Sequence, residues 1–147
     1  MLTATVAGLF GVVRAPQKVI AASEESDSEW DLSDQEWRTR LSPESYQVLR
    51  REGTEPPFTS ALNNEKRTGI YHCAGCDLPL FSSQAKYESG TGWPSFWKPL
   101  SGAIATKVDF KLIVPRTEYH CSRCGGHQGH VFNDGPRPTG QRYCNNG

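Results

Sequence analysis

Four of the five cysteines form two pairs with the spacing of a metal site. Cys73 and Cys76 make one Cys-x-x-Cys pair, and Cys121 and Cys124 make the other. Each two-residue gap lets a tight turn aim both sulfurs at one ion, and four thiolates complete the tetrahedral shell of a structural zinc ion. The spacing therefore predicts one structural Zn²⁺ per chain. Disulfides fit less well, because an odd fifth cysteine would be left over.

The fifth cysteine, Cys144, lies outside both pairs. A lone cysteine is either a small buried apolar side chain or a reactive thiol. Arg142 is close in sequence and two polar residues follow directly, and a nearby cation favours the thiolate, which is the reactive form. This neighbourhood makes Cys144 a candidate nucleophile.

Two histidines follow the second cysteine pair, His127 and His130. Four cysteines already fill a zinc shell, so these imidazoles are available for other chemistry. A thiol with histidine donors near it is the general arrangement for nucleophilic catalysis assisted by proton transfer. The alternatives for the two histidines are extra metal ligation or a place on the surface.

A loop rich in glycine and proline lies between the cysteine pairs and carries three large rings, in the segment Ser-Gly-Thr-Gly-Trp-Pro-Ser-Phe-Trp at 89–97. Exposed rings are unfavourable in water, so this loop must pack against the protein or bind a ligand.

The elements that position these residues are mostly short strands. Residues 30–52 carry the helical signals, with Ser33 and Glu36 as a cap and Ser42 followed by Pro43 opening a second helix. Strand patterns surround both cysteine pairs, at 69–72, 78–81, 113–114, 116–121 and 129–132. Together with many glycines, prolines and aromatic residues, they predict a mostly β fold.

The length of 147 residues suits one domain. Sixteen basic and sixteen acidic residues cancel, so no overall field attracts nucleic acid or an anionic membrane. No uncharged apolar run is long enough for a transmembrane helix. We expect a monomer that binds neither nucleic acid nor membrane.

Residues 1–23 contain no acidic residue and carry Arg14 and Lys18 after an apolar stretch. This composition resembles an organellar transit peptide; a bacterial signal segment or a disordered leader is the alternative. An acidic linker follows, so we divide the chain into a targeting segment with its linker at 1–29 and a catalytic domain at 30–147. We expect an organelle, the chloroplast first, with the cytoplasm as the alternative.

Several motifs in the same order identify a family. They are Gly-Trp-Pro-Ser-Phe at 92–96, the two cysteine pairs, His-Gln-Gly-His-Val-Phe-Asn-Asp-Gly-Pro at 127–136 and Arg-Tyr-Cys at 142–144, with supporting segments at 53–58 and 79–83. Together they resemble the methionine sulfoxide reductases of the B type, over about residues 37–147.

The resemblance implies two antiparallel sheets with short N-terminal helices. It also implies reduction of the R epimer of methionine sulfoxide, in proteins and in free form, as repair of oxidative damage. Cys144 attacks the sulfoxide sulfur, methionine leaves, and a sulfenic acid remains on the enzyme. Thioredoxin, or glutaredoxin with glutathione, then restores the thiol, and oxidised proteins are the substrates.

The resemblance also assigns the binding residues. Trp93 packs on the methyl group of the substrate, and Arg142 belongs to the substrate site. His127, His130 and Asn146 bind and polarise the sulfoxide oxygen, directly or through water.

Three departures from the family pattern stand out. Thr91 occupies the position of a resolving cysteine in many members, so no disulfide can join that position to Cys144. Residues 102–115 lack a Gly-Met pair often found before the family's Arg-Thr-Glu, here 116–118. The family runs on past the position of Gly147 through a closing strand, which predicts a truncated C-terminal end.

Two other functional classes compete with this one. A zinc-ribbon-like binding module would explain the cysteine pairs and the aromatic loop, but not an unpaired cysteine after Arg142. A redox-sensing or zinc-storing scaffold would use the paired cysteines themselves as its oxidisable groups. Turnover of methionine sulfoxide distinguishes the enzyme from both.

Overall fold

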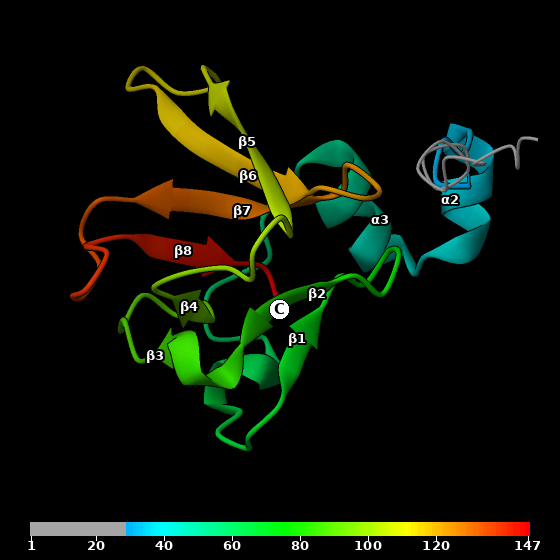
Figure 1. The fold of residues 1–147 in the computed structure, drawn as a ribbon. Helices are drawn as coiled ribbons and strands as arrows, with labels where there is room; N and C mark the ends of the chain where they lie inside the picture. Colours follow the sequence, from blue (N-terminus) through cyan, green and yellow to red (C-terminus); the bar gives the residue numbers. More distant parts are fainter. Residues whose placement is uncertain (1–28) are drawn as a thin grey trace, which may run out of the picture.

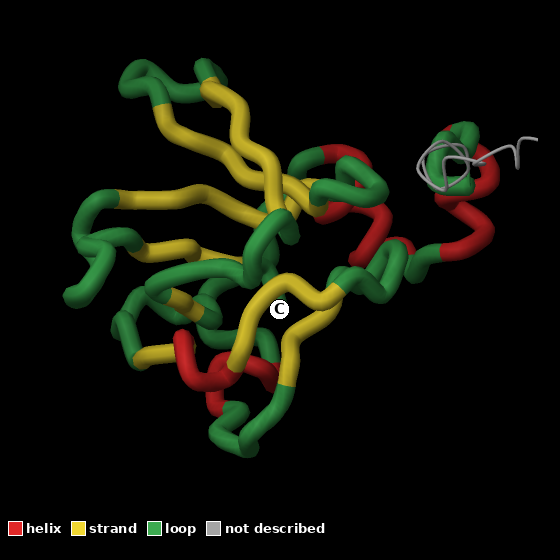
Figure 2. Tube along the Cα trace, viewed as in Figure 1, coloured by secondary structure: helices red, strands yellow, loops and turns green. Residues whose placement is uncertain are grey.

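The computed structural model describes residues 29–147, and the predicted targeting segment therefore lies outside the described residues except for Glu29. The helical elements are α2 (Asp34–Arg40), α3 (Pro43–Arg51) and the 3-10 turns η1 (Ala61–Asn64) and η2 (Ser83–Ala85). The strands are β1 (Ile70–His72), β2 (Pro79–Ser82), β3 (Lys86–Tyr87), β4 (Ser95–Phe96), β5 (Ile104–Asp109), β6 (Arg116–Cys121), β7 (His127–Phe132) and β8 (Arg142–Asn145). Strands and loops make up most of the described chain (Figure 2).

The strands form two antiparallel sheets. One has two strands, β1 and β2, and the other has six in the order β3-β4-β8-β7-β6-β5. Figure 1 shows the β1-β2 hairpin beside the larger sheet, with α2 and α3 at one end of the molecule. The predicted mostly β fold with two antiparallel sheets and short N-terminal helices is confirmed.

Both predicted helix starts are confirmed. Ser33 and Glu36 form a reciprocal capping box at the start of α2, and the Ser42 side chain accepts a hydrogen bond from the Ser45 amide at the start of α3. The helices bury Trp37 and Leu49, and α3 contacts β7. Helix α3 thus packs on β7 of the larger sheet, and α2 packs on α3.

Aromatic side chains fill the space between the two sheets. Phe81 of β2 stacks on Phe96 of β4 with ring centroids 4.3 Å apart, and Tyr119 and Tyr143 pack around Phe81. All four side chains are buried. Since neighbouring residues of a strand point to opposite faces, residues such as Cys144 that flank these tyrosines lie on the other face of the larger sheet.

One strand prediction is wrong. Ile113 and Val114 lie in an exposed loop at 110–115 that closes the β5-β6 hairpin, whose last pair is Asp109 with Arg116. Two apolar residues just before a proline have no partner strand there. The sequence patterns do not predict β3, β4, β5 and β8. Strands β3 and β4 are two residues long, and the side chains of β5 are mostly exposed. Pairing with other strands defines all four.

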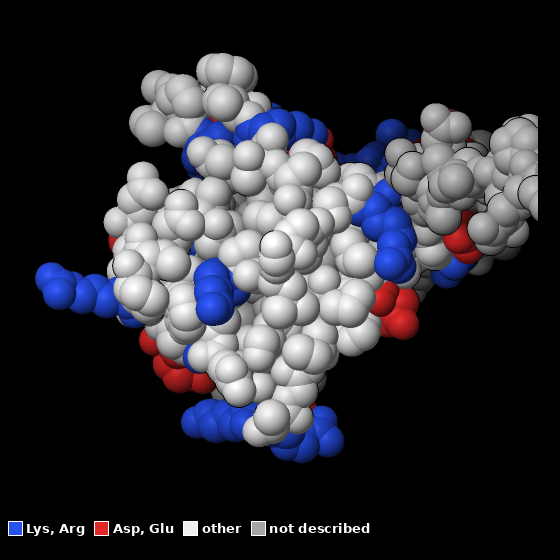
Figure 3. Space-filling view, in the orientation of Figure 1, with Lys and Arg blue, Asp and Glu red and all other residues white. Residues whose placement is uncertain are grey.

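The charges leave one face of the molecule largely bare. In Figure 3 most of the lysine, arginine, aspartate and glutamate side chains in view lie near the margins of the face, and one basic group lies farther in. Among residues 29–147, no helix is both long and apolar enough to cross a membrane.

Candidate functional site

One row of side chains crosses five strands of the larger sheet. Lys107 pairs with Glu118, Glu118 with His130, His130 with Cys144, and Cys144 with Ser95. Residues paired in register point to the same face. The sheet therefore places a lysine, a carboxylate, an imidazole, a thiol and a hydroxyl side by side.

A pocket of about 110 Å³ opens beside Cys144. Its lining residues are Thr54, Trp93, Arg116, Gly129, His130, Phe132, Cys144 and Asn146. The structure thus brings together Trp93, His130, Cys144 and Asn146 out of the predicted site residues. Because Trp93 and His130 are far in sequence from Cys144 and Asn146, only the fold brings the four together.

Two contacts with the loop at 54–58 fix the pocket wall. The indole nitrogen of Trp93 donates to the carbonyl oxygen of Glu55 at 3.0 Å, and the Glu55 amide donates to Oδ1 of Asn146 at 2.9 Å. Asn146 also donates through Nδ2 to the carbonyl oxygen of Gln128 at 2.9 Å. The predicted aromatic loop accordingly packs on the protein and also lines a pocket.

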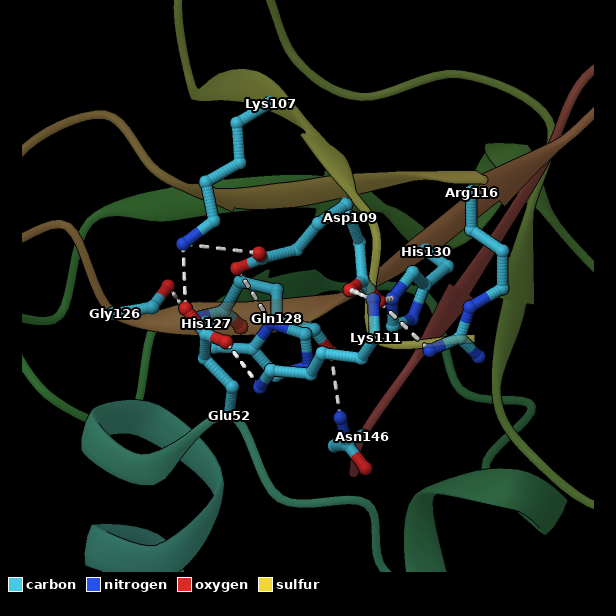
Figure 4. A network of polar contacts seen from close by, with 11 residues as sticks. Glu52, Lys107, Asp109, Lys111, Arg116, Gly126, His127, Gln128, His130 and Asn146 are labelled. Atoms are coloured by element: carbon cyan, nitrogen blue, oxygen red, sulfur yellow. Dashed lines mark hydrogen bonds and ion pairs between the residues drawn. The ribbon is translucent and has the colours of Figure 1, made fainter. Parts of the chain in front are cut away.

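The two predicted histidines lie in different surroundings. Their ring centroids are 5.5 Å apart. His130 lines the Cys144 pocket, whereas His127 is only 2% exposed and lines a larger groove of about 660 Å³ that is also lined by residues of α3 and β1. Nδ1 of His127 hydrogen-bonds Glu118 at 2.7 Å, and its Nε2 is buried with no hydrogen-bond partner within residues 29–147. Figure 4 shows this polar network around both rings.

Burial and charge act in opposite directions on the thiol of Cys144. Burial raises the pKa of Cys144, and the positive charge of Arg142 and the hydroxyl of Thr91 partly oppose that rise. Arg142 therefore acts in the expected direction, but burial outweighs it. The Arg142 guanidinium forms a two-point ion pair with Asp134 at 2.8 and 2.9 Å and lies over the Phe132 ring. It does not line the pocket.

The predicted metal ligands converge. The sulfurs of Cys73, Cys76, Cys121 and Cys124 all lie within 4.8 Å of one another, and all four residues are buried. Sulfurs around one zinc ion at the usual bond length are separated by about 3.8 Å. The sulfur of Cys73 lies 3.7 Å from that of Cys124, and the sulfur of Cys76 lies 3.4 Å from that of Cys121. The four residues fit one tetrahedral ion.

Each cysteine pair sits on a turn that ends in the same backbone conformation. Asp77 and Gly125 follow the second cysteine of their pairs, and both have left-handed φ angles, of 60° and 67°. Gln128 donates to the sulfur of Cys73 at 3.4 Å, and Arg50 of α3 donates to the carbonyl oxygen of Cys124 at 2.9 Å. The cluster is therefore bound to both the sheet and the helices.

Sequence reasoning missed three charged residues of the site. Asp109 binds His130, Glu118 binds His127, and Arg116 lines the pocket and pairs with Asp109. Arg116 and Glu118 belong to the Arg-Thr-Glu segment at 116–118, to which the sequence analysis assigns no chemistry. Their i, i+2 spacing on a predicted strand was the available signal, because it places both on one face.

Known proteins match this chain across the described domain. A SelR domain matches residues 41–147. The chloroplastic peptide methionine sulfoxide reductase B1 of Arabidopsis thaliana is 52% identical over 116 residues, 78% of this chain and 57% of that protein. The peptide methionine sulfoxide reductase MsrB of Thioalkalivibrio sulfidiphilus is 52% identical over 125 residues, 84% of this chain and 91% of that protein.

A third relative, MsrB of Leptospira interrogans, is 54% identical over 119 residues, 80% of this chain and 91% of that protein. The match thus spans little more than half the length of the plant relative and nearly all of the bacterial ones. The chain belongs to the SelR family of type B peptide methionine sulfoxide reductases.

Proposed function

We propose that this chain reduces the R epimer of methionine sulfoxide to methionine, in proteins and in free form, with Cys144 as the nucleophile. The observation that carries the proposal is the pocket that holds Cys144, Trp93 and His130 together. A thioether methyl group needs an apolar wall, and the Trp93 ring supplies one. A sulfoxide oxygen needs hydrogen-bond donors, which an imidazole and an amide provide.

The reaction balances within the pocket. The thiolate of Cys144 attacks the sulfoxide sulfur and forms a sulfur–sulfur bond, and the oxygen takes up a proton because it cannot leave as a bare oxide. The substrate S–O bond and the sulfur–sulfur bond then break as a hydroxyl group becomes bonded to the Cys144 sulfur. The products are a sulfenic acid and a thioether, so the thiol is oxidised while the sulfoxide is reduced. His130, His127 and Asn146 polarise the oxygen, directly or through water. Arg142 lies outside the pocket lining and acts on the substrate site through its charge on the Cys144 thiol.

Stereochemistry follows from holding two substituents of the sulfur. With the methyl group on Trp93 and the oxygen near His130, only one epimer turns its back side to Cys144. We expect that epimer to be R, and repair of oxidised proteins to be the biological role.

The four clustered cysteines would hold one structural Zn²⁺. Buried thiolates at mutual distances near those of a tetrahedral shell support this assignment. A shell filled by four protein ligands supplies stability to the fold and no open position for a substrate.

Reductant and location complete the proposal. An outside thiol regenerates Cys144, either thioredoxin or glutathione with glutaredoxin. The composition of residues 1–23 and the chloroplastic names of two plant relatives support a chloroplast location, while similar bacterial relatives keep the cytoplasm as the alternative.

The test is consumption of each sulfoxide epimer separately, with dithiothreitol as reductant, by the wild-type chain and by Cys144→Ser. We expect the wild-type protein to consume the R epimer only and the serine variant to consume neither. Equal consumption of both epimers, or an active serine variant, would refute the proposed pocket chemistry. A folded wild-type protein without any turnover would favour the binding-module alternative.

A further inference from the structure

Each of the two histidines on β7 forms a hydrogen bond with a different carboxylate, and the two hydrogen bonds involve different ring nitrogens. Glu118 binds Nδ1 of His127 at 2.7 Å, whereas Asp109 binds Nε2 of His130 at 2.8 Å. Figure 4 shows Asp109 between His130 and the guanidinium of Arg116. The pairing of Asp109 with His130 matters most for chemistry, because His130 lines the Cys144 pocket.

The surroundings of Asp109 keep its carboxylate ionised. Asp109 ends β5 and is only 7% exposed. Its oxygens accept hydrogen bonds from the backbone amide of Lys111 at 2.9 Å, from His130 at 2.8 Å and from Arg116 at 2.8 Å. The Lys111 amide, His130 and Arg116 together hold the pKa of Asp109 well below its usual value. This side chain is therefore an anion that only accepts hydrogen bonds.

A hydrogen-bond acceptor next to one nitrogen of a neutral imidazole places the proton on that nitrogen and leaves the other nitrogen unprotonated. Since the Asp109 carboxylate cannot donate, Nε2 of His130 must carry a proton. The remaining nitrogen, Nδ1, makes no hydrogen bond to the protein within residues 29–147. Nδ1 is therefore the ring nitrogen that can gain, hold or donate a proton, on a residue that lines the Cys144 pocket.

Resting on the function proposed above, we propose that Asp109 is a positioning residue for the reaction. It directs the proton of neutral His130 to Nε2, so that Nδ1 takes up the second proton and donates it toward the sulfoxide oxygen. Asp109 acts through His130 and does not itself touch the substrate.

Several charged and titratable groups face His130. Its neighbours besides Asp109 are Arg116 and Glu118 on β6, His127 on its own strand and Cys144 on β8. Burial lowers the pKa of His130, with Arg116 and His127 acting in the same direction, while the hydrogen bond to Asp109 opposes them. Removing the charge of Asp109 therefore favours the neutral ring, which has no proton on Nδ1 to give.

The decisive variant is Asp109→Asn in the full chain, which keeps the shape of the side chain and removes its charge. We expect the pKa of His130 to fall, because an opposite charge within contact distance is lost. The protonated fraction of His130 at neutral pH falls with it, so kcat should fall about tenfold with KM unchanged. In the pH profile of kcat, the limb that reports loss of the His130 proton should move to lower pH.

Asp34→Asn is the matched control. Asp34 is an exposed carboxylate of α2 that pairs with Arg38 at 2.8 Å and with Arg51 at 3.0 Å. It lines neither the Cys144 pocket nor the larger groove. We expect this variant to keep the wild-type kcat and pH profile.

A second measurement does not depend on turnover. Nitrogen-15 NMR of the histidine rings reports which nitrogen carries the proton. In the wild-type protein we expect neutral His130 protonated at Nε2, and in Asp109→Asn a mixture of tautomers. A wild-type His130 protonated at Nδ1 overturns the proposal even if the variant fails to fold, as does a folded Asp109→Asn protein with an unchanged pH profile. If the function proposed above is wrong, the wild-type protein itself will show no reductase activity, which distinguishes that failure from a failure of the Asp109 proposal.

Discussion

Gly129 and Cys144 are packed against each other through their main chains: a Cβ on Gly129 would overlap the carbonyl oxygen of Cys144. Gly129 pairs with Asn145 in the β7-β8 ladder, so any side chain at Gly129 pushes directly on the strand that carries Cys144, the proposed nucleophile. The close approach of the two strands holds Cys144 level with His130.

We therefore expect Gly129→Ala to displace β8. Overpacking of this kind lowers the free energy of unfolding by about 1 to 3 kcal/mol, and a shift near 1 Å at the nucleophile lowers turnover roughly 100-fold. Thermal unfolding and methionine sulfoxide turnover measure the two effects. Gly69→Ala is the control, because nothing lies within 4 Å of a Cβ at Gly69. A Gly129→Ala enzyme with wild-type activity would show that the β7-β8 spacing is not required.

Metal content and folding should be coupled. Cys73→Ser removes one of the four sulfurs and leaves the hydrogen bond from Gln128 without its thiolate acceptor. We expect the variant to lose both bound zinc and thermal stability, because metal binding is linked to folding. Cys144→Ser should keep both. Elemental analysis combined with thermal unfolding tests this, and a metal-free wild-type protein of equal stability would contradict the zinc assignment.

The charge of Arg142 should be visible in the reactivity of Cys144. Arg142 lowers the pKa of a thiol that burial raises, so Arg142→Gln should raise that pKa further. The thiolate fraction at neutral pH then falls, and the pH profile of iodoacetamide alkylation moves to higher pH. Arg38→Gln, which removes an exposed ion pair on α2, should leave the profile in place. An unchanged profile in Arg142→Gln would remove Arg142 from the control of this thiol.

Regeneration should proceed without an internal disulfide. Thr91 is near enough to Cys144 for its hydroxyl to lower the pKa of that thiol, but a hydroxyl forms no disulfide. The other four cysteines lie together in the metal cluster. After one equivalent of methionine sulfoxide without oxygen, a sulfenic acid reagent should label Cys144 and no other cysteine. A disulfide between Cys144 and a cluster cysteine, with loss of zinc, would rule this out.

The same proximity predicts a gain of function. Thr91→Cys should form a disulfide with Cys144 after one turnover and improve turnover with thioredoxin, because a disulfide is the form that thioredoxin reduces. Mass spectrometry of the oxidised variant detects the bond. Thr91→Ser is the control and should form none.

Sequence alone determined the features that depend on neighbouring residues. The two cysteine pairs, the capping box of Ser33 with Glu36 and the proline at the start of α3 all act over two to four positions, so their geometry follows from local chain stereochemistry. The sequence also indicates Cys144 as the candidate reactive thiol, because the other four cysteines have the spacing of metal ligands.

Tertiary structure decided which of these residues meet. His127 and His130 look alike in the sequence, yet the fold gives them different surroundings. The register of β6 and β7 shifts between Tyr119 and His120. His127 is buried against Glu118, whereas His130 lines the pocket of Cys144. The attachment of Asp109 to His130 depends on the pairing of β5 with β6, and β5 itself has no clear pattern. Strand register depends on how the hydrophobic patterns of two segments match and on the turns that join them, so one segment alone does not determine it.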